Sequence, residues 1–421
     1  MSAGKPRPST PPLRQGSLLV EGWRFVPHSY AIVNQFQSLE MAGRPSLRFA
    51  HRDVPYIGRW KPVEGLFPPS EEKAIRAFPK PHPEENFDAV LRVTFPYDYR
   101  SSGFRRTLVF GTAEWRGVSH LSVAGQIPLR AAMERSDALV VTPSRWSRDG
   151  FIASGAPPER VAVVPHGVDP HLYCPAPEER RAVLRRKLKL NGFVFLTVGS
   201  MTENKGIGLL LKAFAALIER YPDAMLLAKG LDDFYGAHDR ILVSARELTD
   251  RERERIRSRF LYIGTPLPFQ SMAELYQAAD AYVSPYLCEG FNMPVLEAAA
   301  CGLPVICTRG GPTDDFTTPD FALRIDSAME SIAPYRHRPD IVGYALRPHF
   351  EHLVTLMAQA MDEPEIVARA RRTGPAFISA GFTWRHAVDR MLDVAFGPLP
   401  AAAQGELPKN VQELKASAAP L

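Results

Sequence analysis

The sequence predicts an α/β protein with two doubly wound, Rossmann-like domains that face each other across a cleft. The chain has 421 residues, more than one hydrophobic core usually organises, and its 45% hydrophobic and 23% charged residues are typical of a folded globular protein. Short apolar segments alternate with helical ones in both halves, a pattern typical of largely parallel sheets. A polar, proline-containing stretch, residues 166–187, separates the halves and is predicted to hold the hinge.

The first domain is predicted to span residues 17–175. Its strands are expected at residues 18–20, 89–93, 108–110, 138–142 and 161–164, and its helices at residues 29–41, 128–135 and 144–154. Residues 1–16 are rich in proline, serine and basic residues and have no apolar core. They are therefore expected to form a disordered lead-in and not a secretory signal.

The second domain is predicted to span residues 176–380 and shows the alternation more clearly. Its strands are expected at residues 193–198, 225–228, 261–263, 281–284 and 305–308, and its helices at residues 206–220, 272–279 and 294–300. In the first of these helices, the apolar residues fall on one face at helical spacing. A C-terminal helix over residues 383–394, within a segment 381–396, and a flexible tail over residues 397–421 are expected to follow.

Charge and cysteine content limit the classes of partner. A net charge of +5 and a pI near 9.0 suit a nucleotide-bearing substrate or an anionic membrane surface, although solubility alone would explain them, and no nucleic-acid partner is expected. The four cysteines show neither zinc spacing nor a disulfide framework, so a cytoplasmic location is expected. Seven arginines make the first domain basic: Arg44, Arg48, Arg52, Arg59, Arg100, Arg105 and Arg106. Most of them are interpreted as a solvent-exposed face. The alternative is a surface that contacts anionic lipid at the inner face of the membrane.

The most informative stretch, residues 288–304, places one carboxylate in a glycine-containing loop and a second in the helix that follows. Glu289 lies in the loop, Pro294 suits the first turn of a helix, and Gly302 suits the residue just past its end. A loop and a helix N-terminus with free N–H groups favour an anionic, hydroxyl-rich ligand. Glu297, about one turn into the helix, can accept two hydroxyls, and Glu289 can face the group beyond the phosphate. The alternative for both acids is structural: a surface loop and a helix-stabilising position.

Five motifs occur in order between residues 136 and 316. They are residues 136–144, a late strand of the first domain; residues 164–169, a P-[NH]-G-[VI]-D motif; Val198-Gly199 with Lys205-Gly206, a phosphate loop; residues 289–297, an E-x7-E motif; and residues 310–314, a G-G-x-x-E stretch. Together they resemble the family-four group of retaining glycosyltransferases, which have the two-domain GT-B fold. The order of the five motifs makes the resemblance specific, whereas any one alone would be weak.

By this resemblance, the second domain binds a nucleotide-diphosphate sugar and the first domain binds the acceptor. Glu289, near the anomeric carbon of the donor sugar, and Lys205, on the diphosphate, would be the catalytic residues. Glu297 would hold the ribose hydroxyls. The other donor-binding residues would be Gly199, Ser200, Gly290, Phe291, Asn292 and Met293. The family generally needs no metal or other cofactor, and the sequence has no D-x-D triplet of the metal-dependent transferases.

Three positions depart from the family pattern. Ser200 follows the phosphate-loop glycine, where the family usually has arginine, so Lys205 is the basic side chain assigned to the diphosphate. The residues after the middle strand of the first domain contain no histidine, and Glu114 or Thr112 is expected to face the same space. Gly22 stands alone where the family has paired glycines after the first strand.

Two further motif residues have structural alternatives. Asp314, in the G-G-x-x-E stretch, is explained as well by capping a helix as by function. His166, in the interdomain motif, is interpreted as structural and not catalytic because it lies at the hinge.

The sequence therefore predicts a retaining, metal-independent hexosyltransferase. It would move a sugar from a UDP- or GDP-linked donor to a glycan or lipid-linked acceptor in cell-surface polysaccharide biosynthesis, with closure of the cleft excluding water. Two alternatives stay open: a sugar-nucleotide epimerase or phosphorylase on the same fold, and a catalytically inactive relative that binds a nucleotide or glycan. The sequence does not indicate the base, the donor sugar, the acceptor, the linkage or the oligomeric state.

Overall fold

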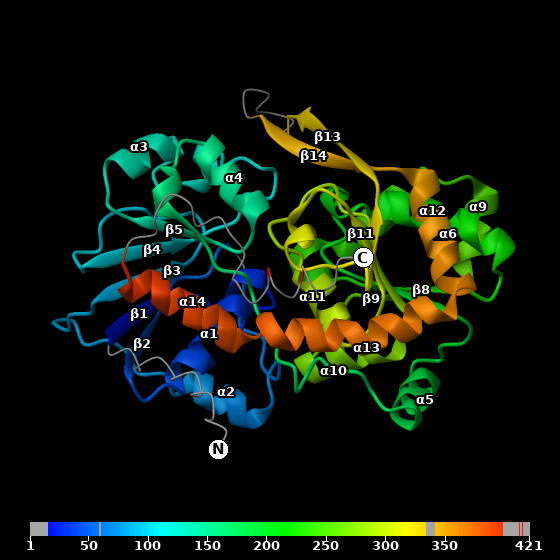
Figure 1. The fold of residues 1–421 in the computed structure, drawn as a ribbon, viewed down its shortest axis with the longest axis horizontal. Helices are drawn as coiled ribbons and strands as arrows, with labels where there is room; N and C mark the ends of the chain where they lie inside the picture. The colour runs from blue at the N-terminus through cyan, green and yellow to red at the C-terminus, as the bar shows by residue number, and fades with distance from the viewer. Residues whose placement is uncertain (1–15, 59, 334–341, 399–411, 413–414, 416–421) are drawn as a thin grey trace, which may run out of the picture.

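The computed structural model describes residues 16–58, 60–333, 342–398, 412 and 415, and it contains two six-stranded parallel sheets, one in each domain (Figure 1). The predicted α/β class with two Rossmann-like domains is confirmed. Strand β1 begins at Gly16, so that residue belongs to a strand, whereas the rest of the predicted lead-in and most of the predicted tail lie outside the described residues. No helix in the described part of the chain is both long and apolar enough to cross a membrane.

The first domain is a parallel sheet in the order β2-β1-β3-β4-β5-β6. Its strands are β1 (Gly16–Gly22), β2 (Leu47–Asp53), β3 (Ala89–Val93), β4 (Arg106–Phe110), β5 (Leu139–Thr142) and β6 (Val161–Val163), and its helices are α1 (Ser29–Ala42), α2 (Pro69–Arg76), α3 (Leu129–Glu134) and α4 (Arg145–Ala153). Every strand and helix predicted for this half is present. The sequence does not predict β2 and α2, because charged residues interrupt β2 and α2 buries one residue, Ile75.

The second domain is a parallel sheet in the order β12-β11-β10-β7-β8-β9. Its strands are β7 (Val194–Val198), β8 (Met225–Lys229), β9 (Phe260–Ile263), β10 (Ala281–Ser284), β11 (Val305–Thr308) and β12 (Ala322–Ile325). Its helices are α6 (Ile207–Arg220), α7 (Asp232–Tyr235), α8 (Ala237–Ala245), α9 (Asp250–Arg257), α10 (Phe269–Ala278), α11 (Met293–Ala300), α12 (Phe350–Asp362) and α13 (Pro364–Gly381). The predicted strands and helices are present, and the apolar face of α6 is buried. The elements not predicted are β12, α7, α8, α9, α12 and α13.

The predicted hinge, residues 166–187, is only partly irregular. Its second half is helix α5 (Glu178–Lys187), in which Leu184 is the buried residue and the other side chains are mostly charged. Arg181 and Arg185 both form ion pairs with Asp280, which follows α10. The distance from Arg185 Nη1 to Asp280 Oδ2 is 2.9 Å. Because these ion pairs attach α5 to the second domain, the irregular connection between the domains is limited to the residues between β6 and α5.

The chain crosses between the domains twice, and the two crossings lie side by side. The first crossing follows β6, and the second leads from α13 into α14 (Trp384–Phe396), which packs on α1 (Figure 1). The Val168 N–H donates to the Phe382 carbonyl at 2.9 Å, and the Trp384 ring stacks on Phe36 of α1 with ring centroids 5.4 Å apart. The predicted C-terminal helix is therefore present, and its buried face belongs to the core of the first domain.

A two-stranded antiparallel hairpin, which the sequence does not predict, extends from the second domain to the first. It is formed by β13 (Ser327–Ile332) and β14 (Gly343–Pro348) (Figure 1). The Tyr344 N–H donates to the Trp115 carbonyl at 2.7 Å. The hairpin is thereby joined to the loop that follows β4 in the first domain.

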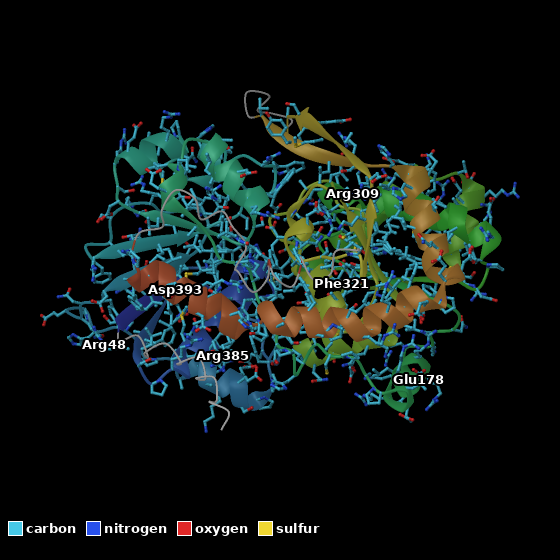
Figure 2. The ribbon with its side chains drawn as sticks, viewed as in Figure 1. Arg48, Glu178, Arg309, Phe321, Arg385 and Asp393 are labelled. Atoms are coloured by element: carbon cyan, nitrogen blue, oxygen red, sulfur yellow. The ribbon has the colours of Figure 1, made fainter. Side chains whose placement is uncertain are left out.

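The arginines that make the first domain basic are mostly engaged within the protein. Ion pairs join Arg44 to Asp389, Arg48 to Glu85, Arg52 to Glu21 and Arg100 to Asp98, and Arg106 donates to the Gly397 carbonyl. Figure 2 shows Arg48 at the outer surface of the first domain. Arg59 lies outside the described residues. The positive charge that this face offers to an anionic surface is therefore smaller than the number of arginines suggests.

Gly167→Ala is expected to destabilise the protein by about 1–3 kcal/mol, the usual cost of overpacking a buried position. A Cβ on Gly167 would lie 2.2 Å from the Trp384 backbone nitrogen, so one of the two crossings would have to move. Gly43→Ala is the matched control, because the nearest atom to its new Cβ would be a carbonyl oxygen at 3.6 Å. Chemical denaturation measures both variants, and equal stability would contradict the close packing of the crossings.

Candidate active site

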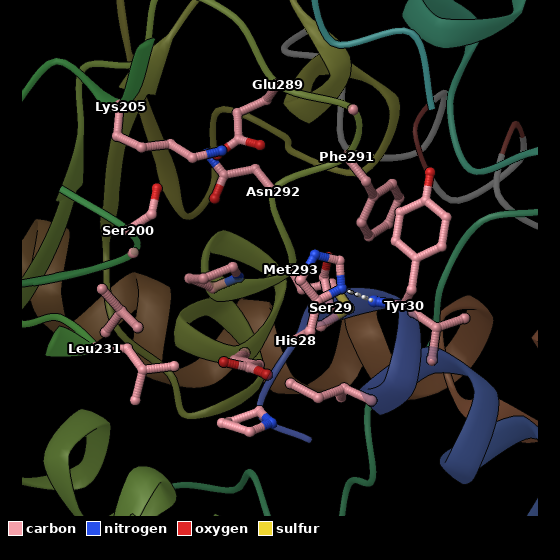
Figure 3. A pocket seen from close by; sticks show the side chains of 18 of the residues that line it. His28, Ser29, Tyr30, Ser200, Lys205, Leu231, Glu289, Phe291, Asn292 and Met293 are labelled. Carbon is pink, nitrogen blue, oxygen red and sulfur yellow. Dashed lines mark hydrogen bonds and ion pairs between the residues drawn. The ribbon is translucent and has the colours of Figure 1, made fainter. Parts of the chain in front are cut away.

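A cavity of about 480 Å³ lies between the two domains. It is lined by residues that follow β1, β4 and β6 in the first domain and β7, β8, β9 and β10 in the second, so the carboxyl ends of both sheets border it. Figure 3 shows part of this wall, with Lys205, Glu289 and Asn292 close together. The predicted residues that line the cavity are Thr112, Glu114, Gly199, Ser200, Lys205, Glu289, Gly290, Phe291, Asn292, Met293 and Glu297.

Lys205 and Glu289 form a buried ion pair on the second-domain side of the cavity. The Lys205 Nζ and Glu289 Oε1 atoms are 2.8 Å apart. Burial lowers the pKa of Lys205, but the charges of Glu289 and Glu114 outweigh it and raise that pKa overall. Burial raises the pKa of Glu289, and Lys205 opposes the rise without cancelling it. The two residues predicted to act on separate parts of the donor are thus one ion pair, which the sequence does not predict.

Glu297 lies about one turn inside α11, where the sequence predicts it. The Tyr276 hydroxyl donates to its Oε2 atom at 2.6 Å, and Tyr173 forms a second hydrogen bond with the carboxylate. Burial raises the pKa of Glu297 to about 7, and the two tyrosines limit the rise. Neither tyrosine is predicted, because Tyr276 fits the buried face of α10 and Tyr173 lies in the irregular connection.

The loop that precedes α11 is held by both domains. Asn292 adopts a left-handed backbone conformation with φ 73°, and its Nδ2 atom donates to Ser284 Oγ at 3.0 Å. The Gly290 carbonyl accepts the hydroxyl of Ser144, the cap of α4 in the first domain, at 2.6 Å. A Cβ on Gly290 would lie 2.7 Å from the Thr112 Cβ, so a larger side chain would collide with the first domain. The N-terminus of α11 is thereby fixed at the cavity.

Lys205 is the one basic residue of the phosphate loop, residues 198–206. The Gly199 N–H donates to the Lys229 carbonyl at 3.0 Å, and the Ser200 hydroxyl lies 2.7 Å from the Thr202 hydroxyl. Ser200 is therefore a neutral group at the position where the family usually has arginine. Among the described residues that line the cavity, the lysines are Lys205 and Lys229.

The first-domain wall holds the two residues expected in place of the family histidine. Thr112 and Glu114 follow β4 and line the cavity, and the Thr112 hydroxyl lies 3.3 Å from the Tyr30 hydroxyl. The pKa values of Lys205 and Glu289 depend most on burial and on the charge of the other residue. The charge of Glu114 is the next largest influence, and it raises both pKa values. Glu114 therefore approaches the ion pair from the opposite domain.

Several residues of the wall are missed by sequence reasoning. His28 caps α1, where its Nδ1 atom accepts the Tyr30 N–H at 3.2 Å (Figure 3), and burial lowers its pKa to about 4. Tyr235 of α7 faces His28 across the cavity, with ring centroids 6.5 Å apart. Lys229 ends β8. None of these residues belongs to a motif. The sequence feature that could have identified Lys229 is its position directly after a predicted strand.

Two predicted positions, Gly22 and Asp314, do not line the cavity. A Cβ on Gly22 would lie 2.7 Å from the Asn34 Nδ2 atom, so this glycine permits close packing against α1. The Asp314 carboxylate accepts the Gly310 N–H at 2.9 Å and so holds the turn before the short helix Pro312–Asp315, whose N-terminus has no side-chain cap. His166 does line the cavity, but burial lowers its pKa to about 3, so the imidazole is neutral at pH 7.

The acids that line the cavity do not form a metal site in the structure. Glu114, Glu289 and Glu297 all border it, but Lys205 engages Glu289 and Tyr276 engages Glu297. Within the described ranges, no three His, Cys, Asp or Glu side chains are grouped closely enough to hold a metal ion. The expectation that the reaction needs no metal or cofactor stays a prediction.

Residues 192–322, which contain Lys205, Glu289 and Glu297, match the family described as glycosyl transferases group 1. These residues, about a third of the chain, form a group 1 glycosyl transferase domain. The chain is 34% identical over 184 residues to the D-inositol 3-phosphate glycosyltransferase of Corynebacterium aurimucosum, covering 42% of each chain. It is 28% identical over 281 residues to D-inositol 3-phosphate glycosyltransferase 1 of Catenulispora acidiphila, covering 65% of this chain and 59% of that protein. The chain thus spans roughly half the length of the curated relatives it matches.

Solved structures share the architecture of this chain over most of its length. HepE of Anabaena, in complex with UDP and glucose, has a TM-score of 0.64 at 15% identity, covering 90% of this chain and 99% of that one. The sucrose-phosphate synthase of Thermosynechococcus elongatus has a TM-score of 0.63 at 18% identity, covering 90% and 98%. At these identities the likeness shows the fold, and the predicted GT-B architecture is confirmed.

Lys205→Met is expected to destabilise the protein, and to do so more at pH 8 than at pH 5. The variant leaves the buried Glu289 carboxylate without its counter-charge, a loss of up to about 3–5 kcal/mol for comparable pairs. Burial raises the folded-state pKa of Glu289, and the variant lacks the Lys205 charge that opposes this rise. The variant therefore loses more stability than wild type as the pH rises above the unfolded value of 4.5.

Thermal unfolding of Lys205→Met and of wild type at both pH values measures this effect. Adding Glu289→Gln to the variant should restore part of the stability and remove the extra loss at pH 8, because the neutral amide needs no counter-charge. A loss that is the same at both pH values would show that Lys205 acts through packing and not through its charge.

Proposed function

We propose that the chain is a retaining glycosyltransferase that transfers a sugar from a UDP- or GDP-linked donor to a glycan or lipid-linked acceptor. The observation that carries the proposal is the meeting of Lys205, Glu289 and Glu297 in one cavity between the domains. All three lie in the segment that matches group 1 glycosyl transferases. The HepE structures hold UDP, UDP-glucose and glucose, which supports a nucleotide sugar as the donor here.

Glu297 is proposed to bind the ribose of the donor. Its carboxylate borders the cavity and has about four lone-pair sites, of which Tyr276 and Tyr173 use two, so two remain for the ribose hydroxyls. The diphosphate then extends toward Gly199 and the N-terminus of α11. Backbone N–H groups and the helix dipole favour an anion at such a terminus.

Stabilisation of the leaving diphosphate is the proposed main catalytic effect. Negative charge grows on the diphosphate as its bond to the anomeric carbon breaks, and a preorganised cation lowers the barrier. Lys205 supplies this cation, and Glu289, 2.8 Å from its Nζ atom, positions the ammonium and faces the donor sugar. The acceptor hydroxyl attacks from the side of the leaving group and passes its proton to the diphosphate, so the anomeric configuration is retained.

The acceptor is proposed to bind at the first-domain wall. His28, Tyr30 and Phe110 give this wall aromatic faces, and Glu114 adds a carboxylate that can accept sugar hydroxyls. Aromatic rings that combine an apolar face with a polar edge suit a sugar ring. A role in cell-surface polysaccharide biosynthesis, a cytoplasmic location and a peripheral membrane contact stay predictions, and the internal pairing of the arginines weakens the last of them.

Product analysis separates the proposal from its alternatives. UDP- and GDP-linked hexoses are incubated with the full chain, with and without a mixture of glycan acceptors. The proposal expects transfer with retained anomeric configuration in the presence of an acceptor. Conversion of the donor alone into another nucleotide sugar would favour an epimerase, and nucleotide binding without turnover of any donor would favour an inactive relative.

Glu289→Gln is expected to lower turnover, while Glu297→Gln is expected to weaken donor binding with a smaller effect on turnover. Each variant loses a charge-assisted hydrogen bond worth about 1.5–3 kcal/mol, or roughly tenfold to a hundredfold. Glu351→Gln, an exposed position in α12, is the matched control and should keep both parameters. Steady-state kinetics give kcat and KM for the donor, and normal turnover in Glu289→Gln would refute its assigned role.

Nucleotide binding is expected to release protons near pH 7 through Glu297. Burial raises the pKa of Glu297 to about 7 in the free protein, so part of the population is protonated there. Ribose hydroxyls donate to the ionised form and lower the pKa in the complex, so UDP should bind more tightly as the pH rises through 7. Calorimetry in buffers of different ionisation enthalpy counts the protons.

Glu297→Gln is the control for this proton release. The phosphates of UDP titrate in the same way with either protein, so the difference between wild type and variant isolates the contribution of Glu297. Equal proton release from the two proteins would contradict ribose binding at this carboxylate.

A further inference from the structure

Lys229 is a buried ammonium that the proposed mechanism does not use. It is the last residue of β8, lines the cavity and is 5% exposed. Among the residues that the structure describes, its Nζ atom has one hydrogen-bond acceptor, the Gly230 carbonyl, and Asp232 is the charge that acts on it. An ammonium has three N–H donors. Two of them are therefore available to a ligand in the cavity.

The Lys229 side chain projects from the same face of the sheet as Glu297. Alternate residues of a strand point to opposite faces, so Lys229 shares its face with Leu227. Leu227 packs in the core cluster that also contains Tyr276 of α10 and Leu296 of α11. Glu297 extends from α11 and is bonded to Tyr276. Lys229 and Glu297 therefore border the cavity from the same side of the sheet.

The cavity wall on the β9 side of Lys229 is apolar. Lys229 pairs with Ile263 at the end of β9, so the residues that follow β9 lie beside it. Of these, Pro266, Leu267, Phe269 and Met272 line the cavity. An apolar surface beside a hydrogen-bond donor suits a nucleobase. On its other side Lys229 neighbours Gly199, whose N–H donates to the Lys229 carbonyl at 3.0 Å, so the base and the proposed diphosphate path lie on opposite sides of this lysine.

We propose that Lys229 donates a hydrogen bond to O4 of uracil or O6 of guanine in the donor nucleotide and thereby selects these bases over cytosine and adenine. The inference rests on the proposed function, because Glu297 must hold the ribose for the base to reach Lys229. Uracil O4 and guanine O6 are acceptors, whereas cytosine and adenine carry amino donors at the corresponding ring positions. An ammonium has no acceptor, so an amino base would place donor against donor.

Burial of Lys229 makes this selection effective. A polar group removed from water costs free energy when it lacks a partner, and an amino base would leave both the ammonium and its own amino group unpaired. Burial lowers the pKa of Lys229 to about 8, with Asp232 opposing, so the ammonium is still mostly protonated at pH 7. The donor character that the selection requires is therefore present under ordinary conditions.

Calorimetry with matched nucleotide pairs tests the proposal on the full chain. UDP is compared with CDP, and GDP with ADP, because each pair differs in an oxo or amino group and in the adjacent ring nitrogen. Wild type should bind the oxo member of the accepted pair at least about tenfold more tightly, as expected for one good base contact. Lys229→Met should reduce the ratio to about threefold or less, mainly by weakening the oxo nucleotide. Lys73→Met, at an exposed position of α2, is the control for loss of one positive charge and should keep the ratio.

The outcomes distinguish this inference from the proposed function. If Lys229→Met weakens UDP and CDP by the same factor, the ammonium contacts the phosphates and the inference is overturned. It is also overturned if wild type binds both members of each pair equally. Failure of wild type to bind any of the four nucleotides would reject the proposed function itself. If Lys229→Met does not fold, Lys229→Gln replaces it, because an amide both donates and accepts and should equalise the pair.

Discussion

The two chain crossings between the domains are the constraint on which the site depends. Gly167 in the first crossing packs against the backbone of Trp384 in the second, and the Val168 N–H donates to the Phe382 carbonyl at 2.9 Å. The second domain is thus anchored through α14 to the core of the first. Because this geometry is fixed, the loop before α11 reaches α4, and the Gly290 carbonyl accepts a hydroxyl from the opposite domain. The carboxyl ends of both sheets then enclose one cavity.

The buried ionisable groups of this cavity are compensated by three different kinds of partner. Lys205 and Glu289 compensate each other at 2.8 Å. Glu297 accepts a tyrosine hydrogen bond and has its pKa raised to about 7 by burial, whereas Lys229 relies on a backbone carbonyl. Burying charge is unfavourable unless it is paired, so these groups are poorly explained by stability alone. A ligand with ribose hydroxyls, phosphates and a base oxygen would supply what each of them lacks.

Short-range sequence patterns predicted the strands and helices whose stability depends on residues close together in the chain. Apolar runs located both sheets, and the spacing from Glu289 to Glu297 placed one acid in a loop and the other in a helix. Highly charged helices such as α5 were missed, because their stability comes from ion pairs with distant elements. The Lys205–Glu289 pair and the tyrosines on Glu297 join residues from separate elements, which no single segment reveals. Gly22 was assigned by position in the family pattern, and its real constraint is the side chain of Asn34.

Ser200 changes how the charge of a diphosphate can be met in this cavity. With no arginine at that position, Lys205 is the nearby cation, and it is already balanced by Glu289, while Glu114 adds a negative charge from the opposite domain. The three side chains together therefore favour an anion less than a free lysine would. Backbone N–H groups at the N-terminus of α11 are neutral, and their dipole acts whatever the state of the ion pair. If the chain binds a diphosphate as proposed, the helix terminus therefore acts beside Lys205, and recognition depends less on fixed side-chain charge.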